Sequence, residues 1–499
     1  MGVIIMSSTV VQTDAKKIGL KWLNIAVVLF FMFIFGRIVP PFATVTPVGV
    51  NVIGVFLGVI YGWGTCGMLW PSLLGMVALG MTGLFGVSDA IALGMGNQMV
   101  LFMILMLIVV ENMNQSGIIT NIANWMIARP ICKGRPWVFA TMIFLIAFLV
   151  SGFANAFPAL FLCWGFWYSI FKQTGYKPYD KFVTCALCGV VFAVILGSIL
   201  LPFHNQPLIF LSSFAAMTGI GTISFVAYLG VLIPYTLCCL IEYVLLCKFI
   251  IRPDVERLKQ FDPLVLTEGK PIVFTKKQIA SALALLAVML GLLLPGVLPK
   301  SWLITQFLSS VGMAGWGIII ITVMCWLKID GEPLLEFNKI ARQGVAWDVI
   351  LFVVMILVIS SVITNEATGI SPFLGAVFGP IFAGKSMFVF TALIVVCSVV
   401  MTNFMNNMVT GFLFMNIVAA YLPVLVANGL NPWTVVTLLI ISANLAFWTP
   451  VASSTAGLLY GNGEWVKKMD VFKVAFITSI FWIITMLTLA FGLANLLFR

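Results

Sequence analysis

Apolar residues occur along the chain in long blocks separated by short polar, glycine- or proline-containing breaks. A helix needs about 20 such residues to cross the roughly 30 Å hydrocarbon core of a bilayer. Blocks of this length recur from residue 22 to residue 497, so the pattern predicts an all-α polytopic membrane protein. The eleven predicted crossings are residues 22–39, 46–65, 67–85, 98–116, 180–200, 223–250, 278–296, 303–327, 346–363, 429–447 and 472–497.

Two further apolar blocks, residues 137–171 and 386–427, are about twice as long as one crossing and are interrupted in the middle. The first breaks at residues 151–155 and the second at residues 402–407, where Asn403, Asn406 and Asn407 interrupt the apolar run. Each block is either two crossings or a re-entrant hairpin. The polar midpoint favours a hairpin, because backbone that breaks at membrane depth needs protein or a water-filled cavity around it.

Composition and charge agree with a membrane location. Hydrophobic residues make up 62% of the 499 residues and charged residues only 8%, whereas soluble domains carry about 25% charged residues. A net charge of +10 could indicate nucleic-acid binding in a soluble protein, but topology explains it here without nucleic acid. We expect a plasma or bacterial inner membrane, a cytoplasmic N-terminus and two hairpins. In this topology only four of the 26 lysines and arginines lie on the far side of the membrane: Arg37, Lys300, Lys385 and Arg499.

A basic linker over residues 251–277 separates two halves, 1–250 and 278–499, that resemble each other. The motif ENMNQSG ends at Gly117 and ITNEATG ends at Gly369, and Asn155 and Asn407 each follow 38 residues later. An odd number of predicted crossings separates the two copies, so they are expected to lie in opposite orientations. Inverted repeats with broken helices are typical of secondary transporters, whose site lies near the bilayer midplane.

Four polar breaks, at residues 151–155, 197–207, 402–407 and 449–455, are expected to converge. An interrupted helix frees backbone carbonyls that can ligate Na⁺ and N–H groups that can hold an anion. Asparagine suits this place because its oxygen can face a cation while its N–H₂ faces a carboxylate. The alternative interpretation is that these amides only cap hairpin tips or join helices.

Other candidate chemistry is sparse. Glu242 is the one acidic residue deep in an apolar run, where it could relay protons or pair at a subunit contact. Cys185 and Cys188 form a CxxC inside an apolar segment, which favours packing over a transition-metal site, and His204 is the only histidine. No P-loop or nucleophile elbow occurs. We therefore expect neither an enzyme nor a cofactor.

Together these motifs resemble the divalent anion/sodium symporters, a family within the ion-transporter superfamily that carries dicarboxylates, citrate or sulfate. The resemblance follows chain order through ENMNQSG, the first hairpin, GSILLPFHNQPLIF, QGVAWDVILF, ITNEATG, the second hairpin and TPVASSTAGLLYG. The family has Ser-Asn-Thr at each hairpin tip and a TPPN-like segment after it. Asn155 and Asn407 fall on the two motif asparagines, while HNQP and SSTA replace the TPPN-like segments.

The resemblance implies two sets of site residues. At the first hairpin tip, Ala154 and Ala156 stand where the family has Ser and Thr. At the second tip, Asn406 and Met408 stand at these two positions. The two tips therefore differ, and the site is expected to be asymmetric. The implied substrate-binding residues are Asn155, Ala156, Pro207, Asn406, Asn407, Met408, Ser453, Ser454 and Thr455. The implied Na⁺-binding residues are Ser151, Asn155, Gly197, Thr402, Met405, Asn407 and Thr449.

The resemblance further implies a Na⁺-coupled symporter of a small anion, such as a di- or tricarboxylate, another organic anion or a sulfate-like ion. It implies a homodimer in which the hairpin-bearing domain moves as an elevator. Two alternatives on the same scaffold are an anion exchanger and a cation/proton antiporter that uses Glu242. A third, of another class, is a non-transporting membrane anion binder or enzyme.

Overall fold

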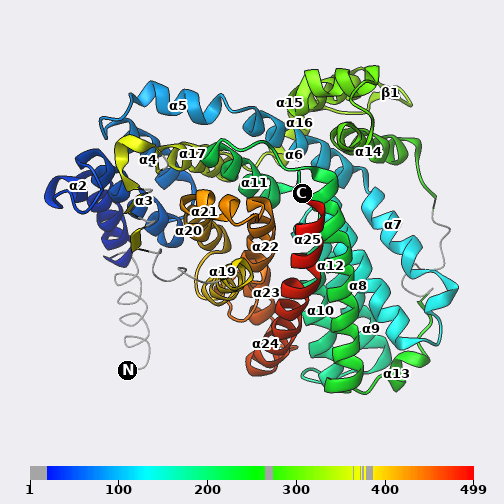
Figure 1. Cartoon of the computed structure of the whole chain (residues 1–499). Coiled ribbons are helices and arrows are strands. Elements are labelled where there is room, and N and C mark those ends of the chain that lie inside the picture. Colours follow the sequence, from blue (N-terminus) through cyan, green and yellow to red (C-terminus); the bar gives the residue numbers. More distant parts are fainter. Residues whose placement is uncertain are drawn as a thin grey trace, which may run out of the picture.

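The structure, a computed structural model, describes residues 19–263, 273–363, 365–370, 372–373, 376–377 and 386–498. Almost all of this part is helical (Figure 1). Its only strands are β1 (Lys328–Ile329) and β2 (Glu332–Pro333), which pair antiparallel in a short turn. The predicted all-α class is confirmed.

Nine helices in the described residues are long and apolar enough to cross a membrane. Eight of them match predicted crossings, and the ninth, Pro136–Phe153, is the first arm of the first predicted hairpin. Three other predicted crossings are shorter helices: α4 (Leu69–Gly80), α17 (Trp347–Ile363) and α22 (Pro432–Asn444). The nine are Gly19–Ile38, Pro47–Thr65, Gln98–Ser116, Pro136–Phe153, Lys181–Ser198, Phe225–Ile251, Lys276–Val297, Leu303–Trp326 and Lys468–Leu497.

The block predicted over 67–85 contains a helix that ends earlier than expected. Helix α4 stops at Gly80 and α5 (Val87–Met95) begins after a tight turn. A Cβ on Gly80 would lie 2.5 Å from the Cα of Val87, so only glycine permits this approach. Gly83 has φ of +90°, a left-handed conformation that glycine adopts at no steric cost.

Both predicted helix breaks inside the long apolar blocks are confirmed by the helix boundaries. In the first block, α8 (Pro136–Phe153) is followed by α9 (Ala156–Thr174), and in the second, α19 (Met387–Thr402) is followed by α20 (Asn407–Ala420). Each pair precedes a helix that ends in a loop, namely α10 (Lys181–Ser198) and α22. A further helix follows each loop, α11 (Asn205–Thr218) and α23 (Ser454–Gly461). The order of helix pair, broken helix, loop and following helix therefore recurs in both halves, with the short helix α21 (Leu422–Ala427) as an addition in the second.

Helices α10 and α22 are deeply buried. All residues of α22 are buried, and so is α10 from Phe182 to Gly197. Rings of Phe192 and Phe447 pack with centroids 4.6 Å apart between the two halves. Since protein surrounds both helices, their polar ends do not face lipid.

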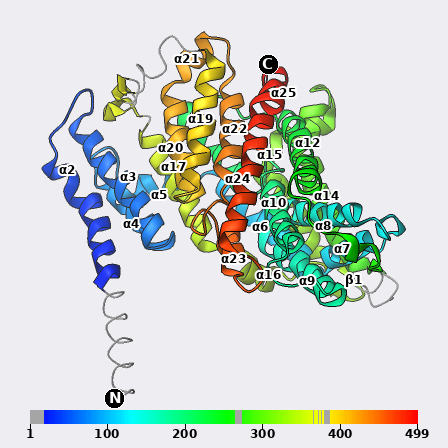
Figure 2. The same cartoon turned by 90° about the horizontal axis from the view of Figure 1, so that it is seen from below.

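The remaining helices of the described residues lie around α10 and α22. In Figure 2 the N-terminal helices lie to one side of α19, α20 and α22. These other elements are η1 (Phe30–Ile34), α2 (Phe35–Ile38), α3 (Pro47–Thr65), α6 (Gln98–Ser116), α7 (Ile118–Ile127), η2 (Pro130–Cys132), α12 (Phe225–Leu245), η3 (Leu246–Ile251), α13 (Glu256–Lys259), α14 (Lys276–Val297), α15 (Leu303–Trp326), α16 (Phe337–Gly344), η5 (Glu366–Thr368), α21 (Leu422–Ala427), α24 (Lys468–Thr485), η6 (Met486–Ala490) and α25 (Phe491–Leu497).

Candidate functional site

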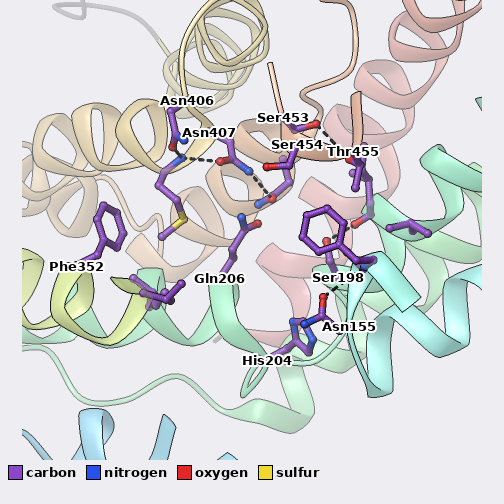
Figure 3. Close-up of a pocket in the computed structure, with 18 of the residues that line it drawn as sticks. Asn155, Ser198, His204, Gln206, Phe352, Asn406, Asn407, Ser453, Ser454 and Thr455 are labelled. Atoms are coloured by element: carbon purple, nitrogen blue, oxygen red, sulfur yellow. Dashed lines mark hydrogen bonds between the residues drawn. The ribbon is translucent and has the colours of Figure 1, made fainter. Parts of the chain in front are cut away.

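Residues from all four predicted breaks line one cavity of about 270 Å³, hereafter the central cavity (Figure 3). Its volume lies just below the usual range for small-molecule sites, about 300–1,000 Å³. The cavity is lined by Met68, Asn155, Ala156, Phe157, Val194, Ile195, Ser198, His204, Gln206, Ile209, Val349, Phe352, Asn406, Asn407, Met408, Asn444, Ser453, Ser454 and Thr455.

Four helices begin at the wall of the central cavity. Their N-cap residues are Asn155 of α9, His204 of α11, Asn406 of α20 and Ser453 of α23, and all four line the cavity. The N-terminus of a helix carries partial positive charge and unpaired backbone N–H groups. Their convergence makes the cavity suitable for an anion.

The local sequence explains three of these helix starts. Asparagine and serine are favoured N-caps because their side-chain oxygens accept from early backbone N–H groups. Asn155 Oδ1 accepts from the N–H of Phe157 at 3.4 Å, and Asn406 Oδ1 accepts from that of Met408 at 2.9 Å. Ser453 Oγ accepts from the N–H of Ala456 at 3.2 Å. Each cap therefore fixes the helix end beside the cavity.

Two helices end at the same cavity. Ser198 is the last residue of α10, Asn444 is the last residue of α22, and both line the central cavity. A helix C-terminus carries partial negative charge on its unpaired carbonyls. Positive and negative helix ends thus meet in one place, which suits the simultaneous binding of an anion and a small cation.

The described residues that line the central cavity include no Lys, Arg, Asp or Glu, and His204 is the one titratable side chain among them. Its Nε2 lies 3.4 Å from the carbonyl oxygen of Ala154. An anion in this cavity would therefore be held by amides, hydroxyl groups and helix N-termini.

At the second break, Asn403 joins the hairpin to the loop that follows α22. Its Oδ1 accepts from the N–H groups of Phe447 at 2.9 Å and Trp448 at 2.7 Å. Its Nδ2 donates to the carbonyl oxygen of Leu445 at 2.9 Å, and the backbone carbonyl oxygen of Asn403 accepts from Thr449 Oγ1 at 2.5 Å. Asn403 is fully buried and holds two broken segments together.

Thr402 and Asn407 lie on either side of this break. Thr402 Oγ1 donates to the carbonyl oxygen of Ala443 at 2.6 Å. Asn407 Nδ2 donates to Asn444 Oδ1 at 3.4 Å, and its Oδ1 accepts from the N–H of Met408 at 3.0 Å. Thr402 and Asn407 can both reach one ion only if the helix stops between them. Helix α19 ends at Thr402 and α20 begins at Asn407, so this condition is met.

The first break has a similar connection. Buried Ser151 donates through Oγ to the carbonyl oxygen of Val194 at 2.7 Å, which ties the end of α8 to α10. The two helices approach closely here, since a Cβ on Gly197 would lie 2.1 Å from the carbonyl oxygen of Phe148. Glycine is required at position 197 for this contact.

Most of the residues implied for substrate binding line the central cavity, whereas several implied for Na⁺ binding do not. Among the substrate residues, Pro207 is not part of the cavity lining, although Gln206 beside it is. Met405 lines a different cavity. Ser151, Gly197, Thr402 and Thr449 lie at or next to the helix breaks and are not part of the cavity lining. The implied residues that line the central cavity are Asn155, Ala156, Asn406, Asn407, Met408, Ser453, Ser454 and Thr455.

Several lining residues were not predicted as site residues. Ser198, His204 and Gln206 lie within the break predicted at 197–207, so the polar interruption gave a signal for them, whereas Asn444 lies inside the predicted crossing 429–447. Met68, Val349 and Phe352 lie in apolar stretches that gave none.

Glu242 does not line the central cavity. Its Oε1 accepts from the hydroxyl of Thr485, so it joins α12 to α24. Among the described residues, no group of three or more His, Cys, Asp or Glu side chains could hold a metal ion, and Cys185 and Cys188 are buried in α10.

Comparisons with known proteins bear on the fold. The fold is similar to that of the YdaH transporter of Alcanivorax borkumensis, with 13% identity and a TM-score of 0.54 over 81% of this chain and 87% of that chain. It is also similar to Neisseria gonorrhoeae MtrF, described as one of a class of antimetabolite efflux pumps, with 14% identity and a TM-score of 0.52 over 95% and 94%. No curated protein matches the chain by sequence.

The family model of citrate transporters, CitMHS, matches residues 59–434. This match covers most of the chain and includes both hairpins, the basic linker and α17. The chain therefore belongs to the CitMHS citrate transporter family, and it is a multi-pass membrane transporter of small organic anions rather than an enzyme.

Proposed function

We propose that the chain is a Na⁺-coupled symporter that moves a small carboxylate-bearing anion across a plasma or bacterial inner membrane. The observation that carries the proposal is the convergence of four helix N-termini on a central cavity whose described lining has no fixed charge. The proposal includes a cytoplasmic N-terminus, opposed re-entrant hairpins and a homodimer, which rest on charge distribution and family resemblance.

The carboxylate would bind where the N-termini of α9 and α20 face the hydroxyl groups of α23. Asn155 and Asn407 supply amide groups, and Ser453, Ser454 and Thr455 supply hydroxyl groups. Hydrogen bonds to an ionised acceptor are roughly twice as strong as neutral ones. Such donors can therefore hold an anion without lysine or arginine.

Na⁺ would bind at the helix breaks behind the substrate. Around the second break the candidates are Thr402, Met405, Asn407 and Thr449, and around the first they are Ser151, Asn155 and Gly197. Asn155 and Asn407 belong to both sets. An anion is costly to bury unless an opposite charge accompanies it, so a cation at these breaks would favour substrate binding and couple the two.

The movement proposed is an elevator in which the hairpins carry substrate and Na⁺ together. Both hairpin tips and both following helices contribute to one cavity, which supports their moving as one body. The N-terminal helices, which lie to one side of α19 and α20 (Figure 2), would remain fixed in the membrane while the hairpins move.

Uptake into proteoliposomes tests this function. Purified protein would be reconstituted and given labelled citrate, succinate or sulfate with inward Na⁺, inward H⁺ or no gradient. We expect carboxylate uptake that an inward Na⁺ gradient stimulates. Uptake that depends on preloaded anion and ignores Na⁺ would show an exchanger, and saturable binding without flux would show a non-transporting binder. Either result would contradict the proposed symport.

A further inference from the structure

One side of the central cavity is apolar. Val349 and Phe352 are three residues apart on α17 and therefore share one face of that helix. Met68 and Met408 extend this apolar wall. In Figure 3, Phe352 lies across the cavity from Asn155, Ser198 and Thr455. The central cavity thus has an apolar wall on α17 and, across from it, a half that contains the polar groups of the helix breaks, hereafter the polar half. Phe157, Val194, Ile195 and Ile209 of α9, α10 and α11 add further apolar surface to the lining.

A second, larger cavity of about 560 Å³ lies on the other side of the second hairpin tip. Asn406 lines both cavities, and Trp63 of the second cavity packs on Phe352 of the first with ring centroids 4.4 Å apart. The second cavity is mostly apolar, with Leu57 and Ile60 in its lining. The hairpin tip and these two aromatic rings therefore lie between the apolar wall and more apolar space.

This division constrains the shape of the ligand. The described residues lining either cavity include no Lys or Arg, so every carboxylate must be satisfied by the polar half. A carboxylate placed against Val349 or Phe352 would find no donor on either of these two side chains, and burying an unpaired charge is strongly unfavourable. An alkyl or aryl group there would instead gain from leaving water.

We propose that the substrate is an amphiphilic organic anion, with one or two carboxylates in the polar half and an alkyl or aryl body against Val349 and Phe352. The inference rests on the proposed transport of carboxylates and narrows its substrate class. Because the second cavity adjoins the apolar wall, ligands with a longer apolar body have room beyond the hairpin tip when Asn406 moves.

Matched pairs of acids test this inference. Binding by thermal shift and uptake into proteoliposomes would be compared for succinate against 2-phenylsuccinate and acetate against phenylacetate, with citrate alongside. We expect the aryl acid of each pair to compete about tenfold more strongly than its parent, because the carboxylates are the same and only apolar burial differs. Parent acids or citrate competing as well as or better than the aryl acids would overturn the inference while leaving carboxylate transport intact. Failure of every acid to bind would instead refute the proposed function.

Two variants test whether Val349 and Phe352 cause the preference for aryl acids. Val349→Thr keeps the side-chain shape but adds a hydroxyl group to the apolar wall, and Phe352→Ala removes the ring. Each is expected to reduce the aryl-to-parent ratio to about threefold or less. Leu351→Ala, on the same helix but outside both cavity linings, should keep the ratio of the unchanged protein. If Phe352→Ala does not fold, Val349→Thr alone tests the inference. An unchanged aryl-to-parent ratio in Val349→Thr would overturn it.

Discussion

Asn403 accepts a hydrogen bond from the backbone N–H of Trp448 at 2.7 Å, so a side chain at one helix break holds the backbone of the other. The same oxygen accepts from the N–H of Phe447 at 2.9 Å. Both breaks of the second half are thereby fixed as one unit. The bonds are buried, so water cannot replace them.

Asn403→Ala is therefore expected to destabilise the protein. It strands the N–H groups of Phe447 and Trp448, at a cost of about 1–3 kcal/mol each. The apparent melting temperature of the detergent-solubilised variant should fall clearly below that of the unchanged protein. Asn428→Ala is the control, because Asn428 donates to a carbonyl at an exposed site and should change stability by less than about 0.5 kcal/mol. Equal melting temperatures for the two variants would contradict a joining role for Asn403.

Asn155→Asp separates helix capping from anion binding. Aspartate caps a helix as well as asparagine does, so α9 should keep its start, but the new charge faces the central cavity. Repulsion of the anion should lower carboxylate uptake by about 100-fold or more, while the melting temperature changes little. Uptake with labelled succinate and thermal unfolding would be measured on the same preparations.

Asn97→Asp provides the matched control. Asn97 caps α6 through Met99 at 2.9 Å and does not line the central cavity, so the same exchange there should leave uptake within about twofold. If Asn155→Asp transports as well as Asn97→Asp, the central cavity is not where the anion binds.

The sequence predicted the helix breaks of this fold because polar residues inside apolar blocks contrast with their surroundings. The same contrast did not distinguish Asn403 from Asn407. Their roles differ because one follows the end of α19 and the other begins α20, and neighbouring backbone decides which amide is buried. Such contacts join residues about 40 positions apart and depend on packing between helices.

The apolar wall could not be predicted for a different reason. Helix α17 reads WDVILFVVMILVISSVI, which is apolar on every face between its first turn and the two serines near its end. Periodicity indicates a cavity-facing side only where polar and apolar faces differ. Val349 and Phe352 are therefore indistinguishable from Leu351 until the positions of neighbouring helices are known.

Thr402→Val tests the proposed cation site at the second break. The change keeps the shape but removes a hydroxyl oxygen that could ligate Na⁺. We expect the Na⁺ concentration for half-maximal uptake to rise about tenfold, equivalent to about 1.4 kcal/mol. Thr391→Val is the control, because that buried threonine also donates to a carbonyl but lies at the other end of α19. The same Na⁺ dependence in both variants would count against a cation at Thr402.

Glu242→Gln tests whether transport needs a deep carboxylate. Glu242 lies between α12 and α24, accepts from Thr485 and is absent from the lining of the central cavity. Glutamine keeps an oxygen that can accept this bond but cannot carry charge or release a proton. We therefore expect carboxylate uptake within about twofold of the unchanged protein, with the same dependence on Na⁺ and external pH. Abolished uptake in a variant with normal thermal stability would instead favour a proton antiporter that works through Glu242, because only the titratable group would have been lost.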